Sequence, residues 1–194
     1  EGMLKGWGFK DITHCDAPDD KAPGGKRPNI VVRMKGRDSS RTLWVVSHLD
    51  VVPPGDLKKW DTDPFKAVVK DGKIYGRGTE DNHQALVASM FAFRALKELG
   101  ITPPMDVALI LGSDEETGSD KGVLYMMDKS IFKKGDIFLV PDGGNEDGTL
   151  MEVSEKTIMW LRFTVEGKQC HGSMPQRGNN AHRAGMKLAL ALDE

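Results

Sequence analysis

The stretch Leu43-Trp44-Val45-Val46-Ser47-His48-Leu49-Asp50 decides how we interpret the fold. Its first four residues favour a β-strand, and Pro53-Pro54 soon afterwards cannot continue a central strand. Side chains two apart on a strand share a face, so His48 and Asp50 emerge together at its carboxyl end. This end of a strand is a favoured place for binding sites in open α/β sheets. Imidazole is a zinc ligand and a nearby carboxylate fixes its tautomer, but on its own a His-x-Asp tripeptide is more often a polar strand end.

The composition is that of a globular protein. The 194 residues are enough for one domain, or one domain and part of another. Apolar residues make up 39% and charged residues 29%, and the net charge is -2, with no basic stripe that would predict nucleic-acid binding. No apolar run approaches the ~20 residues of a membrane helix, and the N-terminus lacks a secretion signal. Cys15 and Cys170 form no CxxC motif and predict no disulfide framework. We therefore expect a cytoplasmic protein that binds neither nucleic acid nor membrane.

The order of the predicted elements indicates an α/β fold. Strands are expected at residues 29–35, 41–48, 105–112 and 136–140, and helices at 81–99 and 121–129. We expect the first two strands to form a hairpin across residues 36–40, and Asp71-Gly72 to turn a second, smaller hairpin. Strands that alternate with helices through short links are typical of a largely parallel sheet.

The pattern changes near residue 154, which suggests two domains. We assign residues 1–154 to a catalytic metal-binding domain and 155–194 to the first part of an α+β domain, with a strand at 157–166 and a helix at 181–192. About forty residues are too few for an independent core. Neither end of the chain carries a capping signal, so we expect a fragment of a longer protein, incomplete at both ends.

Polar groups with metal-binding chemistry follow three of the predicted strands. They are His48 with Asp50, Glu115 with Glu116, and Asp142, while Asp81 opens the helix at 81–99. Alone, Asp81 is best explained as a helix N-cap and residues 114–116 as a solvated acidic loop. Together they predict a carboxylate-rich zinc site with open positions, in which one glutamate binds metal and its neighbour takes a proton from water.

At this point the sequence resembles a known family. The resemblance rests on Ser-His-Leu-Asp-Val-Val-Pro (47–53), Trp60 with Asp63-Pro64-Phe65, Asp71-Gly72, Tyr-Gly-Arg-Gly-Thr-Glu-Asp (75–81), Ser-Asp-Glu-Glu-Thr-Gly (113–118) and Pro-Asp-Gly (141–143). It is similar to the dinuclear zinc metallopeptidase family of aminoacylase, acetylornithine deacetylase, succinyl-diaminopimelate desuccinylase, glutamate carboxypeptidase and bacterial dipeptidases. The resemblance extends from about residue 30 to 185 and implies a three-layer αβα sandwich with a mixed, largely parallel sheet.

The resemblance also implies a role for each matching residue. His48 and Asp142 would hold one divalent ion, Glu116 would hold the second, and Asp81 would bridge the two. Asp50 would orient His48, and Glu115 would be the general base. The ions would be Zn²⁺, with Co²⁺ or Mn²⁺ as alternatives.

The segment Gly-Lys-Gln-Cys-His-Gly-Ser (167–173) resembles the lid motif of that family. His171 would bind the substrate or the oxyanion in a partner subunit, which implies a homodimer formed through the lid domain. The residues alone predict only a loop histidine at this position.

The chain departs from the family pattern in two ways. The last metal ligand of the family is a C-terminal histidine that this chain does not contain, so we expect one ion site to be nearly whole and the other to lack a ligand. Asn82-His83-Gln84 replaces the commoner charged residues after the bridging aspartate.

Two functional hypotheses remain open. The first is a zinc-dependent hydrolase of amide bonds in small peptides or N-acyl amino acids, inactive as an isolated fragment. Aspartate at position 142 resembles the dipeptidases more than the deacylases or carboxypeptidases. The second is a catalytically inert, truncated binding domain of the same fold.

Overall fold

The computed structural model describes residues 1–145 and 147–193, which form two units. The first unit is Glu1–Met151 and the second comprises residues 152–194. We describe each unit by itself.

The first unit is built on a five-stranded mixed sheet in the order β1-β4-β8-β5-β9. The strands are β1 (Ile12–His14), β4 (Ile30–Met34), β5 (Asp38–His48), β8 (Met105–Gly112) and β9 (Ile137–Leu139). β5 runs parallel to both β8 and β9, whereas β4 is antiparallel to β8 and β1. The four strands predicted at residues 29–35, 41–48, 105–112 and 136–140 are therefore present, and the predicted α/β class is confirmed.

The predicted hairpin between β4 and β5 is wrong, because β8 lies between these two strands. Side chains on both faces of β8 are buried, as expected for a strand at the centre of a sheet. The link from β4 to β5 passes the amino end of β8 so closely that a Cβ on Gly36 would lie 2.1 Å from the carbonyl carbon of Met105. Glycine at position 36 permits this crossing.

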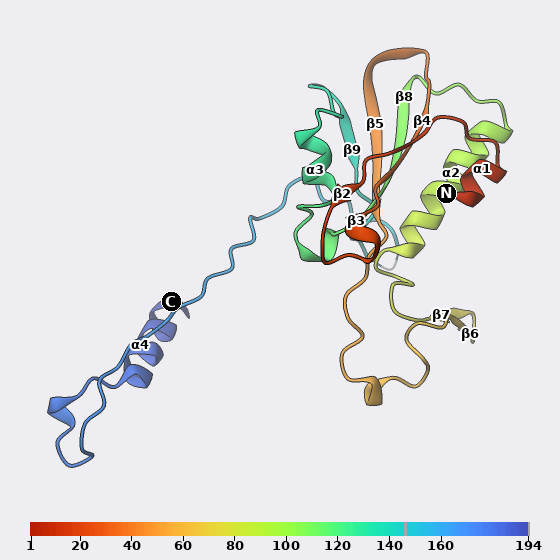
Figure 1. The fold of residues 1–194 in the computed structure, drawn as a ribbon. Coiled ribbons are helices and arrows are strands. Elements are labelled where there is room, and N and C mark those ends of the chain that lie inside the picture. Colours follow the sequence, from red (N-terminus) through yellow and green to blue (C-terminus); the bar gives the residue numbers. More distant parts are fainter. Residues whose placement is uncertain (146, 194) are drawn as a thin grey trace. The chain divides into compact units, whose positions relative to one another are not determined.

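Helices cover the two faces of the sheet, as Figure 1 shows. α2 (His83–Glu98) and α1 (Gly2–Gly6) pack on one face, where Leu86, Met90 and Phe93 meet the strand residues Val32, Leu109 and Leu111. α3 (Val123–Asp128) packs on the other face, where Met126 meets Trp44, Ala108 and Ile110. These two cores make a three-layer αβα arrangement and fix where the strand ends lie.

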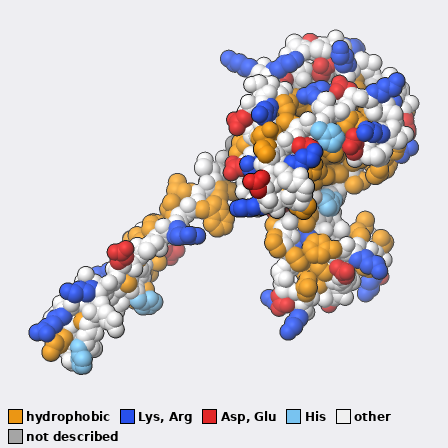
Figure 2. All heavy atoms as spheres, in the orientation of Figure 1, with side chains coloured by type: hydrophobic (Ala, Val, Ile, Leu, Met, Phe, Trp, Pro, Cys, Tyr) orange, Lys and Arg blue, Asp and Glu red, His pale blue; other side chains and the backbone are white. Residues whose placement is uncertain are grey.

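A smaller lobe follows β5, beyond the end of the sheet (Figure 1). It contains the 3₁₀ turn Leu57–Lys59 and the hairpin of β6 (Val68–Lys70) and β7 (Lys73–Tyr75). Asp71 and Gly72 both have positive φ, as the predicted tight turn requires. Hydrophobic side chains reach the surface of this lobe (Figure 2), among them Leu57, Phe65, Val69 and Ile74.

Short elements complete the first unit. They are β2 (Ala17–Pro18), which pairs with β3 (Lys26–Arg27), and the 3₁₀ turns Pro23–Gly25 and Glu115–Thr117. Cys15 and Cys170 are both free. Among the described residues, no helix is both long enough and apolar enough to cross a membrane.

The second unit contains α4 (Ala181–Asp193), as predicted, preceded by the 3₁₀ turn Pro175–Arg177. The strand predicted at residues 157–166 is wrong, because the structure assigns no strand there. A strand needs a partner for its backbone groups, and the pairing found within the described part of this unit is a single bridge between Lys168 and Asn179. The side chains of 157–166 are exposed, including Trp160.

Candidate metal centre

His48 is the last residue of β5, and its side chain is buried. Its Nδ1 lies 2.9 Å from the backbone carbonyl oxygen of Asp50. Because a carbonyl can only accept a hydrogen bond, Nδ1 carries the proton in the neutral ring and Nε2 presents a lone pair. The geometry therefore leaves Nε2 free to act as a metal ligand.

Carboxylates surround Nε2 of His48. Asp81 Oδ1 lies 3.0 Å away, Asp142 Oδ2 lies 3.5 Å away, and Glu115 Oε2 lies 3.9 Å away. Burial alone would lower the pKa of His48, but the bond to the Asp50 carbonyl and the negative charges of Asp142 and Glu115 outweigh it and raise this pKa. Nε2 and the carboxylates that face it therefore favour a positive charge between them, which either a proton on Nε2 or a bound cation supplies.

One ligand atom each from His48, Asp81 and Asp142 lies within 4.8 Å of the other two. The three residues come from the carboxyl end of β5, the residue before the N-cap of α2, and the loop after β9. One imidazole nitrogen and two carboxylate oxygens are donors that Zn²⁺ and other divalent ions accept. The donor set, and its excess of negative charge, fit the divalent ions that the sequence predicted.

The two glutamates lie on the short turn after β8, and Asp50 holds this turn. The carboxylate of Asp50 accepts hydrogen bonds from the backbone N–H groups of Glu115 and Glu116, both at 3.2 Å. The Asp50 carboxylate is farther from His48, with Oδ1 3.6 Å from Nδ1. Asp50 thus contacts the histidine ring through its carbonyl and the glutamate turn through its carboxylate.

Glu115 and Glu116 point to different partners. Burial raises the pKa of Glu115, as do the charges of Asp142, Glu116 and Asp50, while His48 opposes them. Oε1 of Glu116 accepts a hydrogen bond from the backbone N–H of Val52 at 3.0 Å. Glu115 therefore lies beside the cluster of His48, Asp81 and Asp142, and Glu116 is held by the loop that follows β5.

Two residues at the start of α2 belong to this region although sequence reasoning assigned them no role. Asn82 is fully buried, and its side-chain amide contacts both His48 and Asp142. Nε2 of His83 lies 3.1 Å from the carbonyl oxygen of Leu49 and ties the helix to the end of β5. The sequence offered one signal for them, because Asn82-His83-Gln84 replaces the charged residues that are commoner at these positions. The directions of the side chains, however, become apparent only in the folded structure.

His171 lies in the second unit, where its side chain is exposed. Its Nδ1 is 2.8 Å from Oγ of Ser173. The structure describes this residue within its own unit, so its predicted role in substrate binding stays a prediction.

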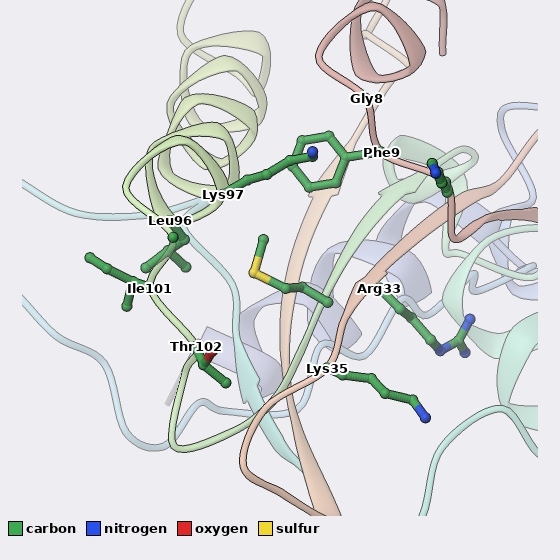
Figure 3. Close-up of a pocket in the computed structure, with 11 residues that line it drawn as sticks. Gly8, Phe9, Arg33, Lys35, Leu96, Lys97, Ile101 and Thr102 are labelled. Atoms are coloured by element: carbon green, nitrogen blue, oxygen red, sulfur yellow. The ribbon is translucent and has the colours of Figure 1, made fainter.

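A hollow lies at the other end of α2, away from the candidate metal centre (Figure 3). It has a volume of about 440 Å³, and Phe9, Met34, Leu96, Lys97 and Ile101 are among the residues that line it. Its lining contains no carboxylate or histidine. In Figure 3 the side chains of Arg33 and Lys35 extend away from Lys97 rather than toward a shared point. This hollow therefore offers no catalytic group for amide hydrolysis.

Comparison with known proteins agrees with this geometry. Residues 44–188 match the sequence pattern described as peptidase family M20/M25/M40. An uncharacterized metallohydrolase of Methanocaldococcus jannaschii is 48% identical over 173 residues, which cover 87% of this chain and 42% of that protein. A succinyl-diaminopimelate desuccinylase of Dechloromonas aromatica is 33% identical over 81% of this chain and 44% of its own length.

The fold is also found among solved structures. The dipeptidase Dug1p of Saccharomyces cerevisiae superposes with a TM-score of 0.59 at 30% identity, over 73% of this chain and 31% of that one. The chain thus spans less than half the length of these relatives. The match over most of the chain, together with the cluster of His48, Asp81 and Asp142, shows that the chain belongs to peptidase family M20/M25/M40, a family of metallohydrolases.

Proposed function

We propose that this protein hydrolyses amide bonds in small peptides or N-acyl amino acids with the help of divalent metal ions. The observation that carries the proposal is the convergence of His48, Asp81 and Asp142 within 4.8 Å, next to the carboxylate of Glu115. An imidazole and several acids at one edge of a sheet are the groups that metal-assisted hydrolysis needs. The family relationship supports a hydrolase.

The ligands would be divided between two ions. His48 and Asp142 would hold one ion, Glu116 the other, and Asp81 would contact both. Oε1 of Glu116 is held by the Val52 N–H, so Oε2 is the candidate ligand atom. Zn²⁺ fits these donors best, with Co²⁺ or Mn²⁺ as alternatives. When bound, such ions polarise the amide carbonyl and lower the pKa of water.

Glu115 is the proposed general base. It takes a proton from the attacking water and delivers it to the nitrogen of the leaving amine. Its position supports this role, because its Oε2 is 3.9 Å from Nε2 of His48 and its backbone N–H is fixed by Asp50. Asp50 orients the base through its carboxylate, and its backbone carbonyl fixes the tautomer of His48.

The second unit is the proposed lid. We assign residues 155–194 to the start of a lid and dimerisation domain, in which His171 of one subunit stabilises the oxyanion in the site of its partner. The exposed imidazole of His171, braced by Ser173, supports this assignment. We further propose a cytoplasmic homodimer.

The substrate class is tested by hydrolysis assays. The full-length protein is incubated with a panel of dipeptides and with acetyl- and succinyl-amino acids, before and after treatment with a chelator. We expect hydrolysis of dipeptides above the acylated amino acids, loss of activity after chelation, and recovery when Zn²⁺ or Co²⁺ is restored. Turnover that survives complete removal of metal would contradict the proposal.

A further inference from the structure

Asn82 occupies the N-cap position of α2 but does not cap the helix. An asparagine at this position ordinarily accepts a hydrogen bond from an N–H of the first turn. Here the side chain makes no such bond and is fully buried. Its polar atoms are used elsewhere.

The amide of Asn82 joins two arms of the metal centre. Its Oδ1 accepts a hydrogen bond from the backbone N–H of His48 at 3.4 Å. Its Nδ2 donates to Oδ1 of Asp142 and, at 3.4 Å, to the carbonyl oxygen of Pro141. The amide thus accepts one hydrogen bond and donates two, so neither its oxygen nor its nitrogen is buried without a partner.

The contact with Asn82 gives the two oxygens of the Asp142 carboxylate different partners. Oδ1 is occupied by the amide of Asn82, whereas Oδ2 is the atom that lies 3.5 Å from Nε2 of His48. Asp142 follows β9, a strand of three residues whose side chains are all partly exposed. The strand itself therefore gives the carboxylate little support, and Asn82 supplies a fixed donor from the more deeply packed α2.

We propose that Asn82 is a positioning residue that holds Asp142 as a one-oxygen metal ligand, with Oδ2 directed at the ion. This inference rests on the proposed function. The amide is suited to the task because it donates a hydrogen bond without adding a negative charge to a cluster that already holds Asp81, Asp142 and Glu115. Hydrogen bonds of this kind to metal ligands are worth about 10–100-fold in metal affinity.

The test is titration of the protein with Co²⁺, followed by visible absorption and calorimetry. Asn82→Leu removes the donor without adding charge, and we expect it to weaken Co²⁺ binding by about 10-fold or more. Asn82→Asp also removes the donor but adds a negative charge. Attraction between charges alone would tighten binding in that variant, whereas loss of positioning weakens it, and we expect it to weaken.

Asn29 provides a matched control. It is likewise fully buried, and its amide donates to the carbonyls of Cys15 and Lys121 and accepts from the N–H of Ser113. Asn29→Leu removes an equally satisfied buried amide that bonds to none of His48, Asp81 and Asp142, so we expect Co²⁺ affinity within about twofold of the wild type in the folded protein.

A double-mutant cycle shows whether Asn82 acts through Asp142. In an Asp142→Asn background, adding Asn82→Leu should change affinity by less than about twofold, because the group that Asn82 positions is already altered. An undiminished effect in that background would overturn the inference, as would Asn82→Leu or Asn82→Asp binding Co²⁺ as tightly as the wild type. If Asn82→Leu does not fold, Asn82→Asp decides alone. A wild type that binds no Co²⁺ would instead contradict the proposed function, and the inference with it.

Discussion

The carboxylate of Asp50 accepts a hydrogen bond from the backbone N–H of Glu115, which lies 65 residues further along the chain. A second bond from the next N–H, that of Glu116, completes the clamp. Since Asp50 also faces Nδ1 of His48 through its carbonyl, one residue aligns the proposed metal ligand and the proposed base. Its carboxylate therefore affects the base more than the ligand.

Asp50→Asn tests this division. One of the two N–H donors loses its acceptor, so the turn that carries Glu115 shifts, and we expect kcat to fall about 10–100-fold. Metal content should stay close to the wild-type value because the carbonyl that orients His48 remains. If kcat and metal content are both unchanged, the Asp50 carboxylate does not position the proposed base.

A bound metal ion should also stabilise the fold. A ligand that binds only the folded state at 100 times its Kd adds about 2.7 kcal/mol to the free energy of unfolding. We expect Zn²⁺ to raise the unfolding temperature of the wild type and to have a much smaller effect on Asp142→Asn. An equal rise in both proteins would show that the ion binds elsewhere.

Asp136 is predicted to stabilise the first unit in a pH-dependent way. Its carboxylate accepts bonds from the N–H groups of Thr42 and Lys133 at 2.8 Å and from Nε1 of Trp44 at 2.7 Å. Burial alone would raise the pKa of Asp136, but the bonds from Lys133, Trp44 and Thr42 outweigh it and lower this pKa. We expect Asp136→Asn to reduce the free energy of unfolding by about 1–3 kcal/mol at neutral pH.

The sign of the pH effect follows from the lowered pKa. The stabilisation is fully present above the unfolded pKa of aspartate, about 4, and is lost as pH falls through the lower folded pKa. The difference between wild type and Asp136→Asn should therefore shrink in acid, as measured by denaturant titration from pH 7 to 3. Asp38→Asn, at an exposed aspartate bonded to Ser40, serves as the control and should change the midpoint little. A difference that grows in acid would refute this account.

Gly36 should tolerate no larger residue. A Cβ there would lie 2.1 and 2.2 Å from the carbonyl carbon and oxygen of Met105. Overpacking of this kind costs about 1–3 kcal/mol or more, so Gly36→Ala should lower the unfolding midpoint clearly. A Cβ on Gly6, in α1, would meet no atom within 4 Å, so Gly6→Ala should leave the unfolding midpoint unchanged or raise it slightly. Equal midpoints for the two variants would show that the link from β4 to β5 has room to move.

The sequence predicted β8 to the residue, because its continuous apolar run describes a strand buried on both faces. It could not predict that β8 separates β4 from β5, since neighbouring strands joined by a short glycine-containing link usually form a hairpin. The strand expected at 157–166 failed for a related reason, because alternation predicts a strand only where a partner is present to pair with it.

Within the site, the positions of His48, Asp81 and Asp142 at the ends of strands and a helix predicted that they lie close together. The structure places one candidate ligand atom of each within 4.8 Å of the other two. The sequence could not reveal Asn82, because the direction of a side chain at a helix start depends on the local backbone. The roles of His48, Asp81 and Asp142 as metal ligands stay predictions, as do the roles of Asp50, Glu115, Glu116 and His171.

Glu115→Gln provides the most direct test of the central claim, that an acid beside a metal centre drives amide hydrolysis. Turnover and metal content are measured on the same preparation of the full-length protein. Since glutamine keeps the shape of the side chain but cannot accept the proton, we predict wild-type metal content with turnover reduced at least about 100-fold. Turnover near the wild-type rate at full metal content would contradict the account.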